Sequence, residues 1–457
     1  MRSPGRTQFM SLMLAEDGKL SQSGPYPSPG QDAARQPRWH LASRDILFAL
    51  VVLASTVQYS VFKVWPREIS LVEIALLLWI GVEAMRGGGL SPRRMPASGK
   101  WMGLLILGLA VWAGILWLVG LDWRYNLNEV RWLLLSVPAF VLLLSTSEQE
   151  IARRLAIVLV IAVVAALVAD LQGVTGAFPP PFAEFSSKQR WLSSDMAVEG
   201  TVAVGLFRHS NMYGGFIFWP LMISIGGVMQ KGKRWVWALG VIFFGASLYL
   251  SYYRGLLLGL GMALAAFTLI MTPFPRRFVA AGLVALPILM VLASILGYAL
   301  KPSAAFFETL RYRINLWQDV LNFIRSDPWI LAFGAGYHPG PALQFSQAGA
   351  DPHNAYLYML MHYGLPGVLI LMAIMGHVVL LGWRAYVRGA MTQRPILAAL
   401  WAGLLAWFAT SLLDSRMTNS EWQVLFVLIL ALLCGFSSLE EGKEVGFSRT
   451  TSAPRKV

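Results

Sequence analysis

The sequence of 457 residues is poor in charged side chains and in cysteine. Only 13% of its residues are charged, about half the share of a typical soluble domain, whereas 56% are hydrophobic. With so few polar groups the chain cannot cover a soluble surface, which excludes a soluble enzyme, a nucleic-acid-binding domain and a disordered protein. The single cysteine, Cys434, can form no internal disulfide and cannot by itself build a metal site.

Motifs of soluble catalysis are also missing. The sequence contains no Walker loop, no G-x-S-x-G elbow, no H-E-x-x-H helix and no Cys/His zinc spacing. No cluster of carboxylates falls on the outer face predicted below, so we expect neither a divalent metal site nor another cofactor. The formal net charge of +13 therefore needs an explanation that involves a membrane.

Long apolar runs are what the sequence has in abundance. A transmembrane helix needs roughly 20 mostly apolar residues, and we count about twelve such runs, where an even number matters more than the exact total. They cover residues 45–62, 69–85, 101–120, 132–145, 155–171, 210–229, 235–252, 255–272, 278–299, 355–383, 395–413 and 422–438. The tenth run is long, and Gly364 with Pro366 is expected to kink it or to end an interfacial segment. The predicted fold is an all-α polytopic membrane protein.

The distribution of Lys and Arg predicts the orientation. The connections on one side carry 24 of the 37 basic residues and those on the other side carry 13. The positive-inside rule then places both termini in the cytoplasm. We predict a disordered cytoplasmic tail over 1–44, a transmembrane domain over 45–438 and a second cytoplasmic tail over 439–457. The two long loops, 172–209 and 300–354, face the other side, and loops of this length are usually functional.

The second long loop contains an amphipathic pattern over 306–324. Its apolar positions recur with helical spacing, at Phe307, Leu310, Ile314, Leu316, Trp317, Val320 and Leu321. Such a helix could lie on the outer leaflet or could cap the bundle of spans.

Four polar clusters lie where the long-loop side meets the spans. They are Gly205–Gly215, Ser251–Gly255, Arg311–Trp317 followed by Gly334–Tyr337, and Asp351–Tyr356. Arg254 sits in a hairpin so tight that its guanidinium must stay near the bilayer boundary. It is either a topological anchor or a grip for an anionic substrate, since the arginine fork binds phosphate oxygens bidentately.

Three further arginines, Arg208, Arg311 and Arg313, are predicted on the same face as Arg254. Several arginines that converge there would clamp a pyrophosphate, whereas Arg311 or Arg313 could also simply decorate the amphipathic helix. The sequence leaves both interpretations open.

His353 is the candidate general base, because the pKa of an unperturbed histidine lies near operating pH. The alternative is an interfacial histidine bonded to a backbone carbonyl, and His209 competes for the catalytic role. Asn354 or Asp351 could cap the helix that follows. Asp414 could pair with Arg416 or orient an arginine of the site.

In order and spacing, these clusters resemble the motifs of the O-antigen ligase / O-antigen polymerase superfamily of polytopic bacterial membrane proteins. The similar segments are Gly205–Gly215 (Gly-x-Phe…Asn…Gly), Ser251–Gly259 (Ser-Arg-Gly…Leu-Gly, with Tyr252-Tyr253 inserted), Arg313–Trp317 with Pro328, Gly334 and Gly336 (Arg-x-x-x-Trp…Pro…Gly-x-Gly), and His353–Leu357 with Gly364–Gly367 (His-Asn-x-x-Leu…Gly-x-x-Gly). The resemblance covers about residues 200–385.

The resemblance implies a metal-independent, inverting glycosyltransferase in the bacterial inner membrane, with a periplasmic active site. It implies a glycan donor on undecaprenyl pyrophosphate. Under this resemblance Arg208 and Arg254 hold the diphosphate, Arg311 or Arg313 assists, and His353 takes the acceptor proton. Supporting roles are expected for Asn211, Asn354, Trp317 and Asp414. Arg208 departs from the family, many of whose members lack an arginine before the Asn segment.

Two acceptors fit this resemblance, and both use the same donor. A lipid A-core acceptor makes the protein an O-antigen ligase, and a growing glycan makes it a polymerase. We favour the ligase on the length of the 300–354 loop alone. A flippase or transporter is the alternative from another class. Such proteins place ionisable residues along a path through the membrane, whereas all 37 Lys and Arg residues here fall in the tails and connections outside the predicted spans. Membrane lipids are expected partners and nucleic acids are not.

Overall fold

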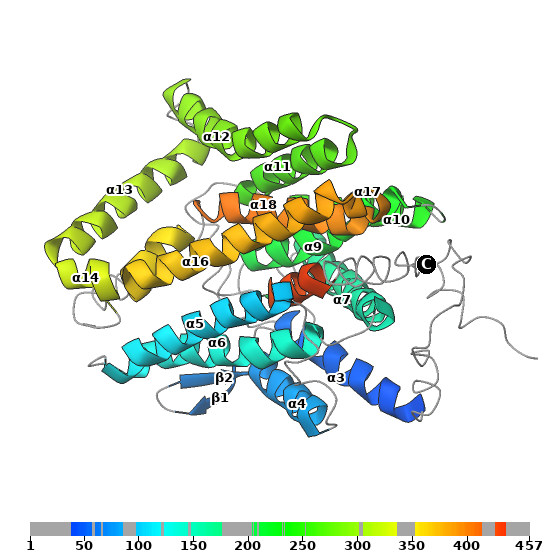
Figure 1. Cartoon of the computed structure of the whole chain (residues 1–457), viewed down its shortest axis with the longest axis horizontal. Helices are drawn as coiled ribbons and strands as arrows, with labels where there is room; N and C mark the ends of the chain where they lie inside the picture. The colour runs from blue at the N-terminus through cyan, green and yellow to red at the C-terminus, as the bar shows by residue number, and fades with distance from the viewer. Residues whose placement is uncertain are drawn as a thin grey trace, which may run out of the picture.

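The computed structural model describes most of the chain between residues 38 and 435. The described residues are 38–56, 60–64, 67–85, 97–119, 123–144, 148–175, 203, 205–207, 210–230, 232, 234–251, 253–300, 305–335, 352–413 and 426–435. Within them the structure is almost entirely helical, as the sequence predicts (Figure 1).

The described residues of the first half form five helices and one small hairpin. The helices are α3 (Arg38–Thr56), α4 (Leu71–Met85), α5 (Ala97–Val119), α6 (Trp123–Leu144) and α7 (Glu148–Thr175). The hairpin pairs β1 (Ser60–Val64) with β2 (Arg67–Ser70) in antiparallel register, Val64 opposite Arg67. It corrects the predicted end of the first apolar run, which was placed at residue 62, whereas α3 ends at Thr56. The residues of β1 include Val61, Phe62 and Val64, types that favour strands.

The second half adds the helices that surround the candidate site. They are α9 (Ser210–Val228), α10 (Arg234–Leu250), α11 (Arg254–Met271), α12 (Arg276–Leu300), α13 (Ala305–Ser326), α14 (Pro328–Phe333), α16 (Ala355–Val387), α17 (Ala390–Gln393) and α18 (Pro395–Thr410), and a further helical segment covers 426–435. Each of the twelve predicted runs overlaps one helix. The amphipathic helix predicted over 306–324 is confirmed as α13, and the predicted kink is confirmed at Gly364 (φ 64°, ψ −166°).

Three of the described helices are long and apolar enough to cross a membrane. They cover Ser98–Val119, Glu150–Thr175 and Ala355–Val387. Other apolar helices, such as Arg234–Leu250 and Pro395–Thr410, are shorter. A helical membrane protein is thus supported, while the count of about twelve spans and the positions of the termini stay predictions.

Some helices begin before the predicted spans do. α3 starts at Arg38, within the segment predicted as a tail, and α6 and α7 start early enough to include Arg131 and Arg154. Arg154 is buried, and its guanidinium lies 5.3 Å from the ring centre of Phe48 and 5.6 Å from that of Trp79. Two aromatic faces offset part of the cost of removing this cation from water.

Helix α18 is the centre of the second half. It packs against α11, α9 and α16, and in Figure 1 it lies between α11 above and α9 below. Small residues allow close approach: a Cβ added to Gly226 of α9 would lie 2.6 Å from the Cα of Ile396, and one added to Gly382 of α16 would meet Trp401. Close packing of this kind is how helices associate in a membrane. It holds α9 and α16 at defined positions against α18.

Candidate functional site

The turn at His353–Asn354 begins α16 and is held in an unusual conformation. His353 has φ 47° and is the one residue other than glycine with positive φ in the described part of the chain. A side chain held there costs about 1–3 kcal/mol, and such strain gathers at functional sites. Asn354 is buried, and its Oδ1 accepts hydrogen bonds from the backbone N–H groups of Tyr356 (3.0 Å) and Leu357 (3.1 Å). The predicted helix cap is therefore Asn354.

Three elements hold this turn in place. The Trp317 indole on α13 donates to the Pro352 carbonyl (2.7 Å), and the Ala355 N–H donates to the Ser411 carbonyl at the end of α18 (2.8 Å). The Arg313 guanidinium donates to the Leu413 carbonyl. Consequently α13, the start of α16 and the end of α18 meet, and they bring Arg313 and Trp317 to the His353 turn.

Helix α11 begins at Arg254 and approaches the same place. Gly259 lies one and a half turns into α11, and an added Cβ on it would lie 2.8 Å from Cγ2 of Thr410. Thr410 directly precedes Ser411, whose carbonyl accepts from the Ala355 N–H at the start of α16. The N-termini of α11 and α16 therefore both lie at the C-terminal end of α18. Of Arg254 the structure describes the backbone, and Tyr253 before it provides no side-chain cap for α11.

The Gly205–Gly215 cluster packs against the α10–α11 hairpin. A Cβ on Gly214 would lie 2.6 Å from Oγ of Ser251 and 3.2 Å from Cβ of Tyr253, so the start of α9 touches the turn that precedes Arg254. Gly205 has φ 58°, and an added Cβ would lie 2.8 Å from Cβ of Ala169 on α7. Glycine at both positions lets the start of α9 sit directly against its neighbours.

Asp170 of α7 has a structural place beside this cluster. Its carboxylate accepts hydrogen bonds from the Tyr213 hydroxyl (2.8 Å) and the Ser247 hydroxyl (2.5 Å). These bonds join α7, α9 and α10. Asp170 thus anchors helices, and the sequence carried no specific signal for this pairing.

The arrangement favours an anionic ligand. The N-termini of α9, α11 and α16 lie at one end of the bundle, linked through the contacts at Gly214, Gly259 and Ala355. Each helix N-terminus carries a partial positive charge of about half a unit. Arginines at the same end add full charges. Phosphate groups are the ligands that such ends commonly bind.

The structure brings together some of the predicted site residues and leaves others apart. Arg313, Trp317, His353 and Asn354 form one cluster. Arg311 is exposed, and its position two residues before Arg313 turns it to another face of α13. Asn211 is also exposed, in the first turn of α9. Arg208, His209, Asp414 and Arg416 lie outside the described residues. The functional roles of all these residues stay predictions.

A group of three His, Cys, Asp or Glu side chains that could hold a metal ion does not occur in the described part of the chain. Metal independence stays a prediction.

The contacts that Gly334, Ala335 and Trp112 make with the α16 kink were not predicted from the sequence. Gly334 (φ 83°), after α14, lies against the kink, since a Cβ added to it would be 2.3 Å from the His362 carbonyl oxygen. The Ala335 N–H donates to the Met361 carbonyl, and the Trp112 indole of α5 donates to the Tyr363 carbonyl (2.8 Å). The two glycine motifs were visible in the sequence, but their mutual contact was not, and Trp112 carried no signal.

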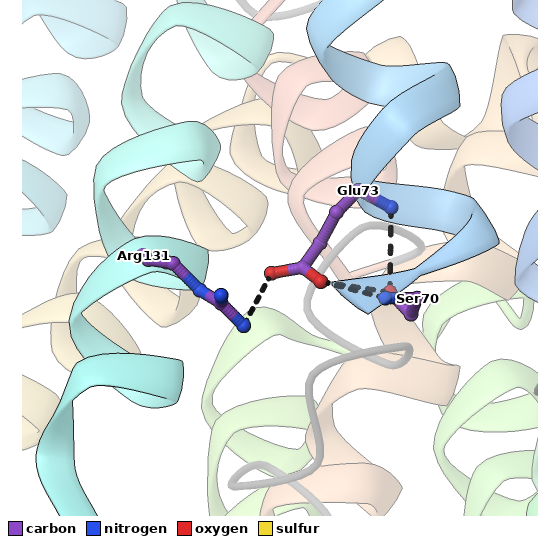
Figure 2. A network of polar contacts seen from close by, with 3 residues as sticks. All are labelled: Ser70, Glu73 and Arg131. Atoms are coloured by element: carbon purple, nitrogen blue, oxygen red, sulfur yellow. Dashed lines mark hydrogen bonds and ion pairs between the residues drawn. The ribbon is translucent and has the colours of Figure 1, made fainter. Parts of the chain in front are cut away.

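An ion pair between a buried glutamate and a half-buried arginine in the first half was missed too (Figure 2). Glu73 is buried and lies 2.9 Å from a guanidinium nitrogen of Arg131. Its other carboxylate oxygen accepts from the Ser70 N–H (2.9 Å), and the Glu73 N–H reaches the Ser70 hydroxyl (3.4 Å). This is a capping box at the start of α4, and Ser-x-x-Glu was its available signal. It joins β2, α4 and α6.

Comparison with known proteins gives two matches. Residues 239–372 match the family model described as O-Antigen ligase. An 88-residue segment is 35% identical to a protein of Pseudomonas aeruginosa named O-antigen ligase, covering 19% of this chain and 21% of that protein. The chain therefore aligns with about a fifth of this relative's length. The family match includes the α11 start, α13 and the His353 turn, and the two matches confirm the resemblance to the O-antigen ligase superfamily.

Proposed function

We propose, from this relation to the O-antigen ligase superfamily, that the chain is a membrane glycosyltransferase. It moves a glycan from undecaprenyl pyrophosphate to a lipid A-core acceptor at the periplasmic face of the inner membrane. One observation carries the proposal: the His353 turn, the α13 residues Arg313 and Trp317, and the start of α11 at Arg254 gather at the C-terminal end of α18. Arg254, Arg313, Trp317 and His353 all fall within the matched segment 239–372.

The proposed reaction is a single displacement. The acceptor hydroxyl attacks the anomeric carbon, the bond from that carbon to the diphosphate oxygen breaks, and undecaprenyl pyrophosphate leaves with the electron pair. His353 takes the hydroxyl proton as general base. Attack opposite the leaving group inverts the anomeric configuration. The hydrogen bonds at Pro352 and Ala355 support this role, because they fix the backbone on both sides of His353.

The leaving diphosphate needs positive charge around it. Arg254 at the start of α11 and Arg208 before α9 are proposed to bind it, with Arg313 assisting from α13. Preorganised cations and helix N-termini stabilise charge as it develops on a leaving group, and one such donor is commonly worth 10²–10³ in rate. The convergence of three helix N-termini supports this assignment.

A ligase and a polymerase would share this chemistry and differ in the acceptor. The family description and the relative's name, both O-antigen ligase, support the ligase. The test is to give purified protein a lipid-linked glycan together with either lipid A-core or a second lipid-linked repeat unit. Product on lipid A-core is expected. A ladder of lipid-linked chains would identify a polymerase instead, and the absence of both products would refute the enzyme and leave a flippase or transporter.

Variants of the base separate catalysis from folding. His353→Asn is the informative change, since asparagine tolerates the left-handed backbone at φ 47° but cannot serve as the base. We expect His353→Asn and His353→Ala to abolish transfer while the yield of monodisperse protein is retained. Transfer by His353→Asn at the wild-type rate would refute the general-base role.

An arginine pair tests the diphosphate site. Arg254→Ala is expected to abolish transfer, whereas Arg325→Ala removes an exposed arginine from the last turn of α13 and is expected to leave it unchanged. Equal effects of the two substitutions would show that general loss of positive charge, rather than a site at Arg254, explains the result.

A further inference from the structure

We propose that Trp112 of α5 is a positioning residue for the reaction, acting through the kink of α16 on the His353 turn. The inference rests on the proposed function and extends the site beyond the segment 239–372 that matches the family. It assigns a role in catalysis to the first half of the chain.

The kink exposes backbone groups that need partners. Pro366 has no N–H, so the His362 carbonyl loses the donor that a regular helix would supply. Gly364 adopts non-helical angles (φ 64°, ψ −166°) at the same point. Two neighbouring carbonyls accept from outside the helix: that of Met361 from the Ala335 N–H and that of Tyr363 from the Trp112 indole (2.8 Å). The direction of α16 before the kink thus depends on Trp112 of α5 and on Ala335, two residues after α14.

Trp112 also fixes the element that fills the kink. Its ring stacks on Phe333 of α14 (centroids 6.2 Å apart, planes at 27°), and Phe333 stacks on Trp329 (5.6 Å, 18°). Phe333 directly precedes Gly334, whose backbone lies against His362 and Tyr363. The Trp112 side chain therefore contacts both elements that meet at the kink: it donates a hydrogen bond to α16 and stacks on a ring of α14.

The segment of α16 between the turn and the kink acts as a short lever. It runs from Ala355 to Tyr363, about 12 Å at 1.5 Å per residue. Its first end is bonded to α18: the Ala355 N–H donates to the Ser411 carbonyl, and the Tyr356 hydroxyl donates to the Phe408 carbonyl (2.7 Å). Without the Trp112 bond at the other end, a rotation of about 5° at the kink would act against these bonds and move the His353 end by up to about 1 Å along this lever. A displacement of that size in a catalytic group can cost on the order of 100-fold in rate.

The experiment removes the hydrogen bond while keeping a ring in place. The variants are Trp112→Phe and a tryptophan analogue at position 112 in which sulfur replaces the indole N–H. Trp101→Phe, at an exposed tryptophan near the start of α5, is the matched control. We expect both changes at 112 to lower kcat for glycan transfer by about 10- to 100-fold with KM for the lipid-linked donor unchanged. The control should behave as wild type.

A second measurement does not depend on activity. Amide hydrogen exchange of residues 355–363 is expected to speed up in both position-112 variants and not in Trp101→Phe. The positioning role would be overturned if amide exchange of residues 355–363 were unchanged in the position-112 variants. It would also be overturned if KM for the donor rose by as large a factor as kcat fell. If the wild-type protein transfers no glycan, the proposed function falls, and the exchange rates alone decide whether Trp112 holds the His353 turn.

Discussion

Two substitutions of Asn354 separate its role as a helix cap from the effect of a negative charge near the proposed diphosphate. Its Oδ1 accepts from two backbone N–H groups at 3.0 Å and 3.1 Å, and the side chain is 6% exposed. Asn354→Ala leaves both donors without this partner. Loss of a cap costs about 1–2 kcal/mol, and the burial of these groups places the cost toward the upper end.

Asn354→Asp should behave differently. The carboxylate keeps an acceptor for both N–H groups, and negative charge at a helix N-terminus is favourable by about 0.3–1 kcal/mol. Its charge, however, lies at the end of the bundle where we propose the diphosphate. A phosphate charge about 8 Å away would be repelled by about 2 kcal/mol at an effective dielectric constant near 20, which weakens donor binding roughly 30-fold.

The assays are thermal unfolding in detergent and the KM for the donor. Asn354→Ala should lower the melting temperature by roughly 1–2 °C for each kcal/mol lost, since the entropy of unfolding is large in a chain of this length. Asn354→Asp should melt like wild type and raise KM. Asn322→Asp, which adds the same charge at an exposed position of α13, is the control. Wild-type melting of Asn354→Ala would refute the cap, and an unchanged KM in Asn354→Asp would refute the position of the anion.

Two further substitutions test contacts that the structure defines. Glu73→Ala should destabilise the protein by about 2–3 kcal/mol in thermal unfolding, because it removes both the helix cap and a buried partner of Arg131. Glu73→Gln keeps an acceptor for the Ser70 N–H and should lose less stability. Equal losses in the two variants would contradict the capping role. Gly214→Ala should cost about 1–3 kcal/mol and lower transfer activity, since its Cβ would lie 2.6 Å from Oγ of Ser251 and displace the turn before Arg254. Adding Ser251→Ala removes that oxygen and should restore part of the loss; no recovery would show that the close approach is not the cause.

The positions of the helices followed from the apolar runs. An apolar run in a membrane has no water to bond its backbone N–H and C=O groups, and a helix pairs these groups within the run. Helix ends were less predictable. The run through residue 62 continues past the end of α3 into β1, since hydrophobicity alone does not distinguish a helix from a buried strand. Arg154 of α7 is buried with its guanidinium near two aromatic rings, and their approach is visible only in three dimensions.

Among the candidate site residues, those tied to a local pattern were the most predictable. Asn354 could be named as a cap because a cap acts on the next few residues, and Gly364 as a kink because glycine and proline disrupt a helix locally. The contact of Trp317 with Pro352 joins positions far enough apart that no local pattern reports it. The same holds for the bond from Trp112 to Tyr363, which joins positions 251 residues apart.

The sequence by itself determined that this is a helical membrane protein, where its polar clusters lie along the chain, and which family it resembles. Those properties depend on composition, on apolar runs and on residues that are neighbours in the chain. Only the tertiary structure decided which clusters meet. It set the starts of α9, α11 and α16 at the end of α18, turned Arg313 inward and Arg311 outward, and placed Trp112 against the kink of α16. The physical reason is that close packing between helices depends on where small residues from distant segments face one another, and that is a property of the folded bundle.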